Sequence, residues 1–397
     1  MALQPAAGVR DLNPREVERQ RRLCELLAEV YRLWGYQEVA PPTIERLDTL
    51  QADGAIPSRA LVRLAADEPL GLRPECTASI ARAAGTRLAE KPRPLRLWAC
   101  GSTYRSVVSD NASLRITEDL QSGVELLGVA SAAADTELIH LLLAAVASLG
   151  LEAKHQPTLL LGHQGLLSGV LQPIDPEHRP GVRRALTDLD PLALAGIQLP
   201  EPQRLALQAL LALRGTPQDV LAALRRQLGC IELLDSLQSI LEGVAPLASR
   251  QGVRLQLDPT FQPHFDLYDG LVFKLVCQGP HAPVEIASGG RYDALVGRFS
   301  RDPTRAAGTG FAFSIETIAD LLGPGSPRLA TTAPWLVAAA GADGLLRALG
   351  RMAELHASGE PAELCPWPCQ DETELEAIAE RRGCRGAVWL PEGGVAG

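Results

Sequence analysis

The stretch that decides the fold begins with Leu72-Arg73-Pro74-Glu75-Cys76-Thr77-Ala78, continues through Thr103-Tyr104-Arg105, and closes with Glu118-Asp119-Leu120-Gln121-Ser122-Gly123-Val124-Glu125. The pattern predicts a helix from Thr77 to about Glu90, a strand over Leu95–Tyr104, and a second strand over Leu120–Leu127. Successive side chains of a strand point to opposite faces. The second strand therefore carries Gln121, Gly123 and Glu125 on one face and Leu120, Ser122, Val124 and Leu126 on the other.

The polar face of this second strand has two interpretations. A half-buried strand ordinarily turns its polar face to water, and the face then has no further role. Alternatively, Glu75, Arg105, Gln121 and Glu125 line one cleft. Such a group suits a zwitterionic ligand, because carboxylates bind an ammonium group and a guanidinium binds a carboxylate. The pattern by itself leaves both interpretations open.

These residues resemble motif 2 of the class II aminoacyl-tRNA synthetases in its histidyl form. In that family Arg-Pro-Glu-Gly-Thr is followed by Phe-Arg-x-Glu and then by Gln-x-Gly-x-Glu, whereas this chain has Cys76 at the glycine position. The resemblance extends over roughly residues 8 to 322. A helix that starts at Asn13-Pro14 and a strand over Tyr36–Ala40 are similar to motif 1, which implies a dimer interface.

Three further segments continue the resemblance. Phe265–Phe273 is predicted to be a hairpin that turns at Asp269-Gly270, and it resembles the first histidine-specific motif of the family. Ser288–Leu295 matches the second such motif, Gly-Gly-Arg-Tyr-Asp-x-Leu, completely. Gly308–Ile318 resembles motif 3.

The resemblance implies an α+β fold, with a class II synthetase-like antiparallel sheet flanked by helices. Helical patterns at 177–250 indicate a helical insertion, and the tail alternates strand and helix patterns, as in a small α/β unit. The expected organisation is a synthetase-like domain at 1–322, a linker at 323–327 and a C-terminal unit at 328–397 that is smaller than an anticodon-binding domain.

The resemblance also implies a pocket for histidine. Glu75 and Thr77, with Gln121 beside them, would hold the α-amino end of the ligand. Glu125, Tyr268 and Tyr292 would bind the imidazole, which needs an acceptor and a donor on opposite edges. Arg105 would be the motif 2 arginine. The expected histidine-binding residues are Glu75, Thr77, Arg105, Gln121, Glu125, Tyr268 and Tyr292.

Positions that handle ATP in the synthetases differ here. The arginine of the first histidine motif is replaced by Pro263, and the arginine of motif 3 is replaced by Thr317. Val107 replaces the glutamate that helps to seat adenine. Each lost fixed charge of this kind removes about 3 kcal/mol of transition-state stabilisation. We therefore expect no catalytic residues and no cofactor.

A paralogous family combines this fold with such losses: the regulatory subunits of ATP phosphoribosyltransferase. The resemblance implies a short catalytic subunit as partner, a role in the first step of histidine biosynthesis, L-histidine as a feedback effector, and self-dimerisation. Two alternatives stay open, namely a histidine–tRNA ligase with degenerate motifs and a free-standing histidine sensor or an amino-acid ligase for another carrier.

Composition restricts the partners. The net charge is −9, and residues 328–397 hold six basic against ten acidic residues, or −4, which disfavours tRNA binding.

Eight scattered cysteines show no disulfide framework and no convincing zinc spacing, so no metal is expected. The longest apolar runs, such as Leu141–Leu149, are too short to span a membrane, and no signal peptide is apparent. We expect a cytoplasmic protein.

Overall fold

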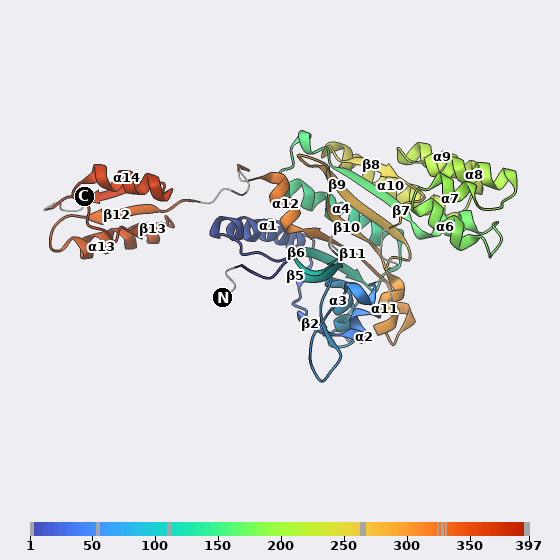
Figure 1. Ribbon diagram of the computed structural model, residues 1–397, viewed down its shortest axis with the longest axis horizontal. Coiled ribbons are helices and arrows are strands. Elements are labelled where there is room, and N and C mark those ends of the chain that lie inside the picture. Colours follow the sequence, from blue (N-terminus) through green and yellow to red (C-terminus); the bar gives the residue numbers. More distant parts are fainter. Residues whose placement is uncertain are drawn as a thin grey trace. The chain divides into compact units, whose positions relative to one another are not determined.

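The computed structural model describes residues 4–52, 56–108, 113–262, 267–323, 325–326, 329 and 332–392. The chain forms two compact units, residues 1–329 and 330–397 (Figure 1). The larger unit contains an eight-stranded sheet in the order β1-β5-β6-β11-β10-β9-β7-β8. Its inner strands run antiparallel, and β1 and β8 pair in parallel at the two edges. The strands are β1 (Gln37–Glu38), β5 (Leu95–Val108), β6 (Leu114–Leu127), β11 (Gly308–Ser314), β10 (Pro283–Arg291), β9 (Leu271–Gln278), β7 (Thr158–His163) and β8 (Arg254–Leu257).

The two strands of the motif 2 stretch are longer than the sequence predicted. β5 and β6 pair over their whole lengths, from Leu95 opposite Leu127 to Val108 opposite Leu114. The extension follows from the β-branched residues beyond Tyr104, which favour a pleated ribbon even where it is exposed. The helix α3 (Thr77–Gly85) is shorter than predicted, because Gly85 lies against the backbone of Phe299 and the helix ends there.

Helices cover the two faces of the sheet differently. On one face, α1 (Pro14–Leu33), α4 (Ala132–Leu149) and α12 (Ile315–Leu322) pack against Trp98, Val124 and other apolar residues. On the other face, α3 and α11 (Asp293–Phe299) pack against Leu97, Ala99 and Leu127. The alternation within β5 and β6 thus separates the main core from a smaller layer, and Gln121, Gly123 and Glu125 belong to the smaller layer.

Two long helices, α1 and α4, contribute many residues to the main core. Asn13 caps α1 with a complete capping box to Glu16, as a Ser/Thr/Asn start signal predicts. The helix α4 has the length and hydropathy that a membrane-spanning helix would need, a stretch longer than the apolar run singled out in the sequence. It lies instead in the core, where Leu138, Ile139 and Leu141 to Leu143 are almost entirely inaccessible to solvent.

The helical insertion and the small C-terminal α/β unit are both present. The insertion contains α6 to α10, and α7 starts at Pro191, since proline favours the first turn of a helix. The smaller unit is a parallel sheet in the order β13-β12-β14 with α13 and α14. The elements are α5 (Gln164–Leu171), α6 (Arg179–Thr187), α7 (Pro191–Ala195), α8 (Glu201–Ala212), α9 (Pro217–Leu228), α10 (Glu232–Arg250), β12 (Trp335–Ala339), α13 (Gly344–Ala357), β13 (Ala362–Leu364), α14 (Glu372–Arg382) and β14 (Gly386–Leu390).

A small antiparallel sheet leads into the motif 2 stretch. It has the order β2-β4-β3, and β3 and β4 pair antiparallel just before Arg73. Its elements, with the short helix that follows β2, are β2 (Ile44–Arg46), α2 (Leu47–Leu50), β3 (Val62–Arg63) and β4 (Leu70–Leu72).

The predicted hairpin with its turn at Asp269-Gly270 is wrong for the residues that the structure describes. Residues 267–270 form no strand, and β9 starts at Leu271 and pairs with β7 and β10. The Asp269 carboxylate instead accepts the backbone N–H groups of Asp293 (3.1 Å) and Ala294 (2.6 Å). The Asp-Gly pair is therefore used to cap α11, a long-range role that local turn statistics do not reveal. Pro263 to Asp266 lie outside the described residues.

Candidate functional site

One cavity of about 280 Å³ lies over the face of the sheet that carries Glu125. All seven residues that the sequence singled out line it: Glu75, Thr77, Arg105, Gln121, Glu125, Tyr268 and Tyr292. They come from the loop before α3, from α3 itself, from β5 and β6, and from the two segments that flank one end of the antiparallel β9–β10 pair. The polar face of β6 is thus turned toward a cavity and not toward open solvent, which decides between the two interpretations of its alternation.

Glycines make room for the cavity over the sheet. Gly310 lies directly opposite Glu125, and Gly290 lies opposite Gly310 on the next strand. A Cβ atom at Gly310 would overlap the Glu125 carboxylate, and one at Gly290 would approach the Tyr268 ring within 2.6 Å. The glycines in the motifs are therefore required by close approach, since any side chain here would displace the two residues expected to bind imidazole.

Glu125 is buried and holds two hydrogen bonds at the bottom of the cavity. Its Oε1 accepts from the Thr77 hydroxyl at 2.7 Å, and its Oε2 accepts from the Tyr292 hydroxyl. Burial raises the pKa of Glu125 to about 8, although the hydrogen bonds from Thr77 and Tyr292 oppose the rise. Near neutral pH this carboxyl therefore holds a proton that a basic ligand can share.

The loop before α3 places Glu75 at the start of that helix. Its carboxylate accepts the backbone N–H of Thr77 and that of Ala78 (3.0 Å), so it satisfies two of the unpaired donors of the first turn. Cys76, which stands where the family has glycine, has φ −97° and needs no left-handed backbone. The substitution therefore leaves the backbone of this loop unstrained.

The opposite end of the β6 face is held by a polar chain that the sequence analysis did not assign. Gln121 donates to Asp119 at 3.3 Å, and Asp119 also accepts from the Ser314 hydroxyl at 2.9 Å. Burial raises the pKa of Asp119. Ser314 caps α12 by accepting from the backbone N–H of Thr317. The residue that replaces the motif 3 arginine is thus part of a helix cap and brings no charge to the cavity.

Two cationic side chains line the cavity among the described residues. Arg105 donates from Nε to the Pro74 carbonyl at 3.2 Å. Lys274 forms an ion pair with Glu285, with 2.8 Å between Nζ and Oε2. Lys274, Glu285, Asp119 and Ser314 were not predicted as site residues. A signal did exist for Asp119, which shares the period-two face of Gln121 and Glu125, but Lys274 follows a buried phenylalanine in an apolar strand, and nothing local marks it.

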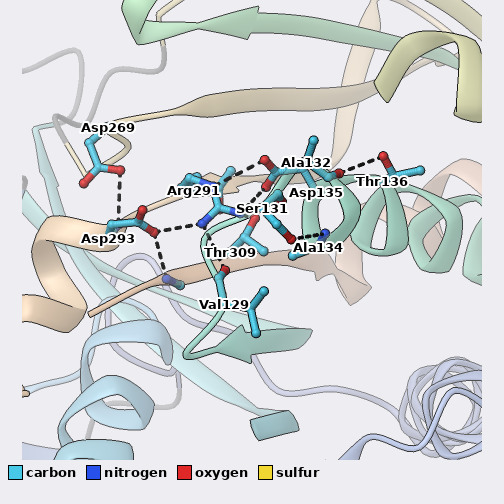
Figure 2. A network of polar contacts seen from close by, with 12 residues as sticks. Val129, Ser131, Ala132, Ala134, Asp135, Thr136, Asp269, Arg291, Asp293 and Thr309 are labelled. Atoms are coloured by element: carbon cyan, nitrogen blue, oxygen red, sulfur yellow. Dashed lines mark hydrogen bonds and ion pairs between the residues drawn. The ribbon is translucent and has the colours of Figure 1, made fainter. Parts of the chain in front are cut away.

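A buried ion-pair network fixes the end of β10 next to Tyr292 (Figure 2). Arg291 donates to the Asp135 carboxylate at 2.7 and 3.3 Å and to Asp293 at 3.0 Å. It also donates to the backbone carbonyls of Val129 and Ser131. The arginine of the second histidine motif therefore ties β10 to the first turn of α4 and does not line the cavity.

The cavity suits a small zwitterion with a basic or polar side chain. Its described lining offers the acidic side chains of Glu75, Asp119, Glu125 and Glu285 for positive or basic groups, and it offers Arg105 and Lys274 for a negative group. The described residues contain no cluster of three or more His, Cys, Asp or Glu side chains placed to hold a metal ion. Val107 lies on the exposed part of the β5–β6 ribbon, 39% accessible, and does not line the cavity.

Known proteins share both sequence and fold with this chain. A family model described as histidyl-tRNA synthetase matches residues 8–318. An ATP phosphoribosyltransferase regulatory subunit of a Synechococcus species is 52% identical over 393 residues, which cover 98% of this chain and 100% of the relative. One from Prochlorococcus marinus is 51% identical over 390 residues, again 98% and 100% of the two chains.

Two solved structures extend the comparison. A protein from Bacillus halodurans described as an ATP phosphoribosyltransferase regulatory subunit/histidyl-tRNA synthetase has a TM-score of 0.82 at 25% identity, with full coverage of both chains. A histidyl-tRNA synthetase from a Nostoc species has a TM-score of 0.78 at 17% identity, over 98% of this chain and 92% of the other, and shows the fold alone. The predicted class II synthetase-like α+β fold is confirmed.

Proposed function

Since the chain belongs to the family of ATP phosphoribosyltransferase regulatory subunits, we propose that it is the non-catalytic subunit of that enzyme and acts in the first step of histidine biosynthesis. Its partner is a short catalytic subunit. Its effector is L-histidine, bound in the cavity lined by Glu125. It works in the cytoplasm and takes part in neither tRNA charging nor membrane binding.

One observation carries the proposal. The residues expected to bind histidine meet in a single cavity, whereas positions that the synthetases use on ATP have lost their charge. Thr317 supports this, because its backbone N–H and hydroxyl both contact Ser314 in the cap of α12. An amino-acid site without the machinery for ATP can still bias a conformational equilibrium, provided that it binds one state more tightly.

Reconstitution tests the proposal directly. The short catalytic subunit is expected to be nearly inactive alone, to become active when this chain is added, and to lose that activity when histidine is added. The formation of phosphoribosyl-ATP measures all three states. If the catalytic subunit is equally active and equally inhibited by histidine without this chain, the proposed role is wrong.

The isolated protein is expected not to activate histidine. With Thr317 in place of arginine, no guanidinium from this position meets the charge that develops on the α-phosphate, so turnover should fall by about a hundredfold or more from this change alone. Histidine-dependent exchange of pyrophosphate into ATP measures this activation of histidine. Exchange clearly above the level without histidine would favour the alternative, a degenerate histidine–tRNA ligase.

We also propose a dimer formed through α1 and β1. In the larger unit α1 buries Leu23, Leu27 and Tyr31 toward α4 and β5, while Leu33 at its end is 86% exposed next to the edge strand β1. Replacement of Leu33 by aspartate is expected to shift the protein toward monomer in sedimentation velocity at micromolar concentration. Leu192 is 83% exposed on the insertion, so Leu192→Asp serves as the control and should leave the mass unchanged.

The smaller unit is proposed to have lost anticodon binding. The net charge of −4 over residues 328–397 opposes contact with phosphates, from which most tRNA affinity derives. Binding of tRNA to the full chain that weakens steeply with salt would contradict this. A free-standing histidine sensor, the other alternative, would bind histidine without associating with the catalytic subunit, and co-purification of the two chains separates these cases.

A further inference from the structure

The ion pair between Lys274 and Glu285 lies in the cavity without a role in the histidine pocket as described so far. Nζ and Oε2 are 2.8 Å apart, and the two side chains are 21% and 40% exposed. Lys274 also lies 5.9 Å from the centre of the Phe261 ring. This pair stands on β9 and β10, on the side of the cavity away from β6.

Strand register places Lys274 across the cavity floor from Glu125. Gly123 is opposite Ala312, Ala312 is opposite Ser288, and Ser288 is opposite Lys274, so these four residues form one row across the sheet. Glu125 stands two residues further along β6. Three strand spacings amount to about 14 Å. Lys274 and Glu125 both line the cavity, from opposite sides of its floor.

Ser288 and Ala312 lie between Gly123 and Lys274 in this row, and both have short side chains, so the floor of the cavity is low there. The row thus forms a shallow trough that runs to Lys274 from Gly123, which is two residues from Glu125 on β6. A ligand with a base at one end and an acid at the other fits such a trough in one orientation.

The other cation of the lining is placed less suitably for this ligand. Arg105 is in register with Thr117, eight residues along β6 from Glu125, or about 27 Å in an extended strand. Its guanidinium also donates to the Pro74 carbonyl. By strand register, the backbone of Lys274 therefore lies nearer to Glu125 than that of Arg105.

We propose that Lys274 binds the α-carboxylate of the histidine ligand, and that the ligand replaces Glu285 as its ionic partner. The inference rests on the proposed histidine-binding function. One consequence is specificity for amino acids over the corresponding amines. A second is that ligand binding releases the Glu285 carboxylate from its ion pair at the rim of the cavity.

The test compares histidine with histamine, which keeps the imidazole and the ammonium group but lacks the carboxylate. Calorimetry with the full-length Lys274→Met variant is expected to show histidine affinity reduced by about 10- to 150-fold, because a hydrogen bond to a charged group is lost. Histamine affinity should stay within about twofold of the unchanged protein, which also shows that the variant is folded. The matched control is Lys154→Met, which breaks the exposed Lys154–Glu152 pair outside the cavity and should change neither affinity.

A second variant has an effect of opposite sign. Glu285→Gln removes the competing carboxylate, so histidine affinity should rise severalfold while histamine affinity is unchanged. If Lys274→Met weakens both ligands equally or neither, or if Glu285→Gln weakens both, Lys274 does not bind the carboxylate and the inference fails. If the unchanged protein binds neither ligand, the proposed histidine site itself is wrong.

Discussion

Replacement of Glu125 by alanine is expected to weaken histidine binding by about 5- to 150-fold, which corresponds to roughly 1–3 kcal/mol. The change leaves the imidazole without its acceptor. It also leaves the hydroxyls of Thr77 and Tyr292, which both donate to this carboxylate, without their partner. In the complex with the catalytic subunit, the same variant should be inhibited less by histidine while its uninhibited rate is preserved.

A control on the same strand separates this effect from general damage to β6. Glu118 lies on the opposite face from Gln121 and Glu125, and its carboxylate accepts from the Tyr104 hydroxyl at 3.1 Å. Glu118→Ala should leave histidine binding and inhibition unchanged. If Glu125→Ala alters neither binding nor inhibition, the effector site lies elsewhere, on the catalytic partner or at the joint interface.

The raised pKa of Glu125 gives this binding a specific pH dependence. Free imidazole has a pKa of about 6.5, and the buried carboxyl has a pKa of about 8. Between about pH 6.5 and 8 the carboxyl of the empty site holds a proton and the free imidazole does not. The bound pair shares that one proton, so binding needs neither proton uptake nor proton release. Above about pH 8 the empty site loses that proton, and affinity should fall by about tenfold per pH unit as it must be taken up again.

A neutral isostere tests the origin of that decline. Glu125→Gln cannot lose this proton, so its histidine affinity should decline less steeply between about pH 7.5 and 9, where only the ammonium group of the ligand titrates. Isothermal calorimetry in two buffers of different ionisation heat measures the affinity and the protons exchanged. An equally steep decline above pH 8 in Glu125→Gln would show that another group titrates.

The second large effect is expected at Arg291. Replacement of Arg291 by methionine should lower the free energy of unfolding of the larger unit by about 3–5 kcal/mol, because it strands the buried carboxylate of Asp135 without its partner. Asp293 loses a partner as well. Urea denaturation followed by circular dichroism measures the change. The double variant Arg291→Met/Asp135→Asn should cost less than the sum of the single changes, since it removes both members of the buried pair.

Arg46 offers a matched control for this prediction. It also lies between two carboxylates, those of Asp48 and Glu68, but its side chain is 54% exposed. Arg46→Met should cost about 1 kcal/mol or less, because water screens the surface pair. Equal losses at Arg46 and Arg291 would contradict the argument that burial makes the Arg291 network costly to break.

Local sequence patterns were sufficient for elements whose causes are local. The start of α1 follows from Asn13 and Pro14, and the apolar run at Leu141–Leu149 lies within α4. The face of β6 that carries Gln121 and Glu125 follows from the period of a strand. The family motifs then named the seven residues that line one cavity, because each motif is a contiguous stretch that keeps its spacing.

The features that the sequence did not predict depend on contacts between distant parts of the chain. Asp269 appeared to be a hairpin turn, yet it caps α11, and no local signal distinguishes these uses. Lys274 acquired its place when β9 paired with β10 and brought it beside Glu285. The charge state of Glu125 is likewise a property of burial. The sequence by itself determined the family, the elements and the set of pocket residues, whereas tertiary packing decided which groups are desolvated and which charges meet, because both depend on neighbours that are remote along the chain.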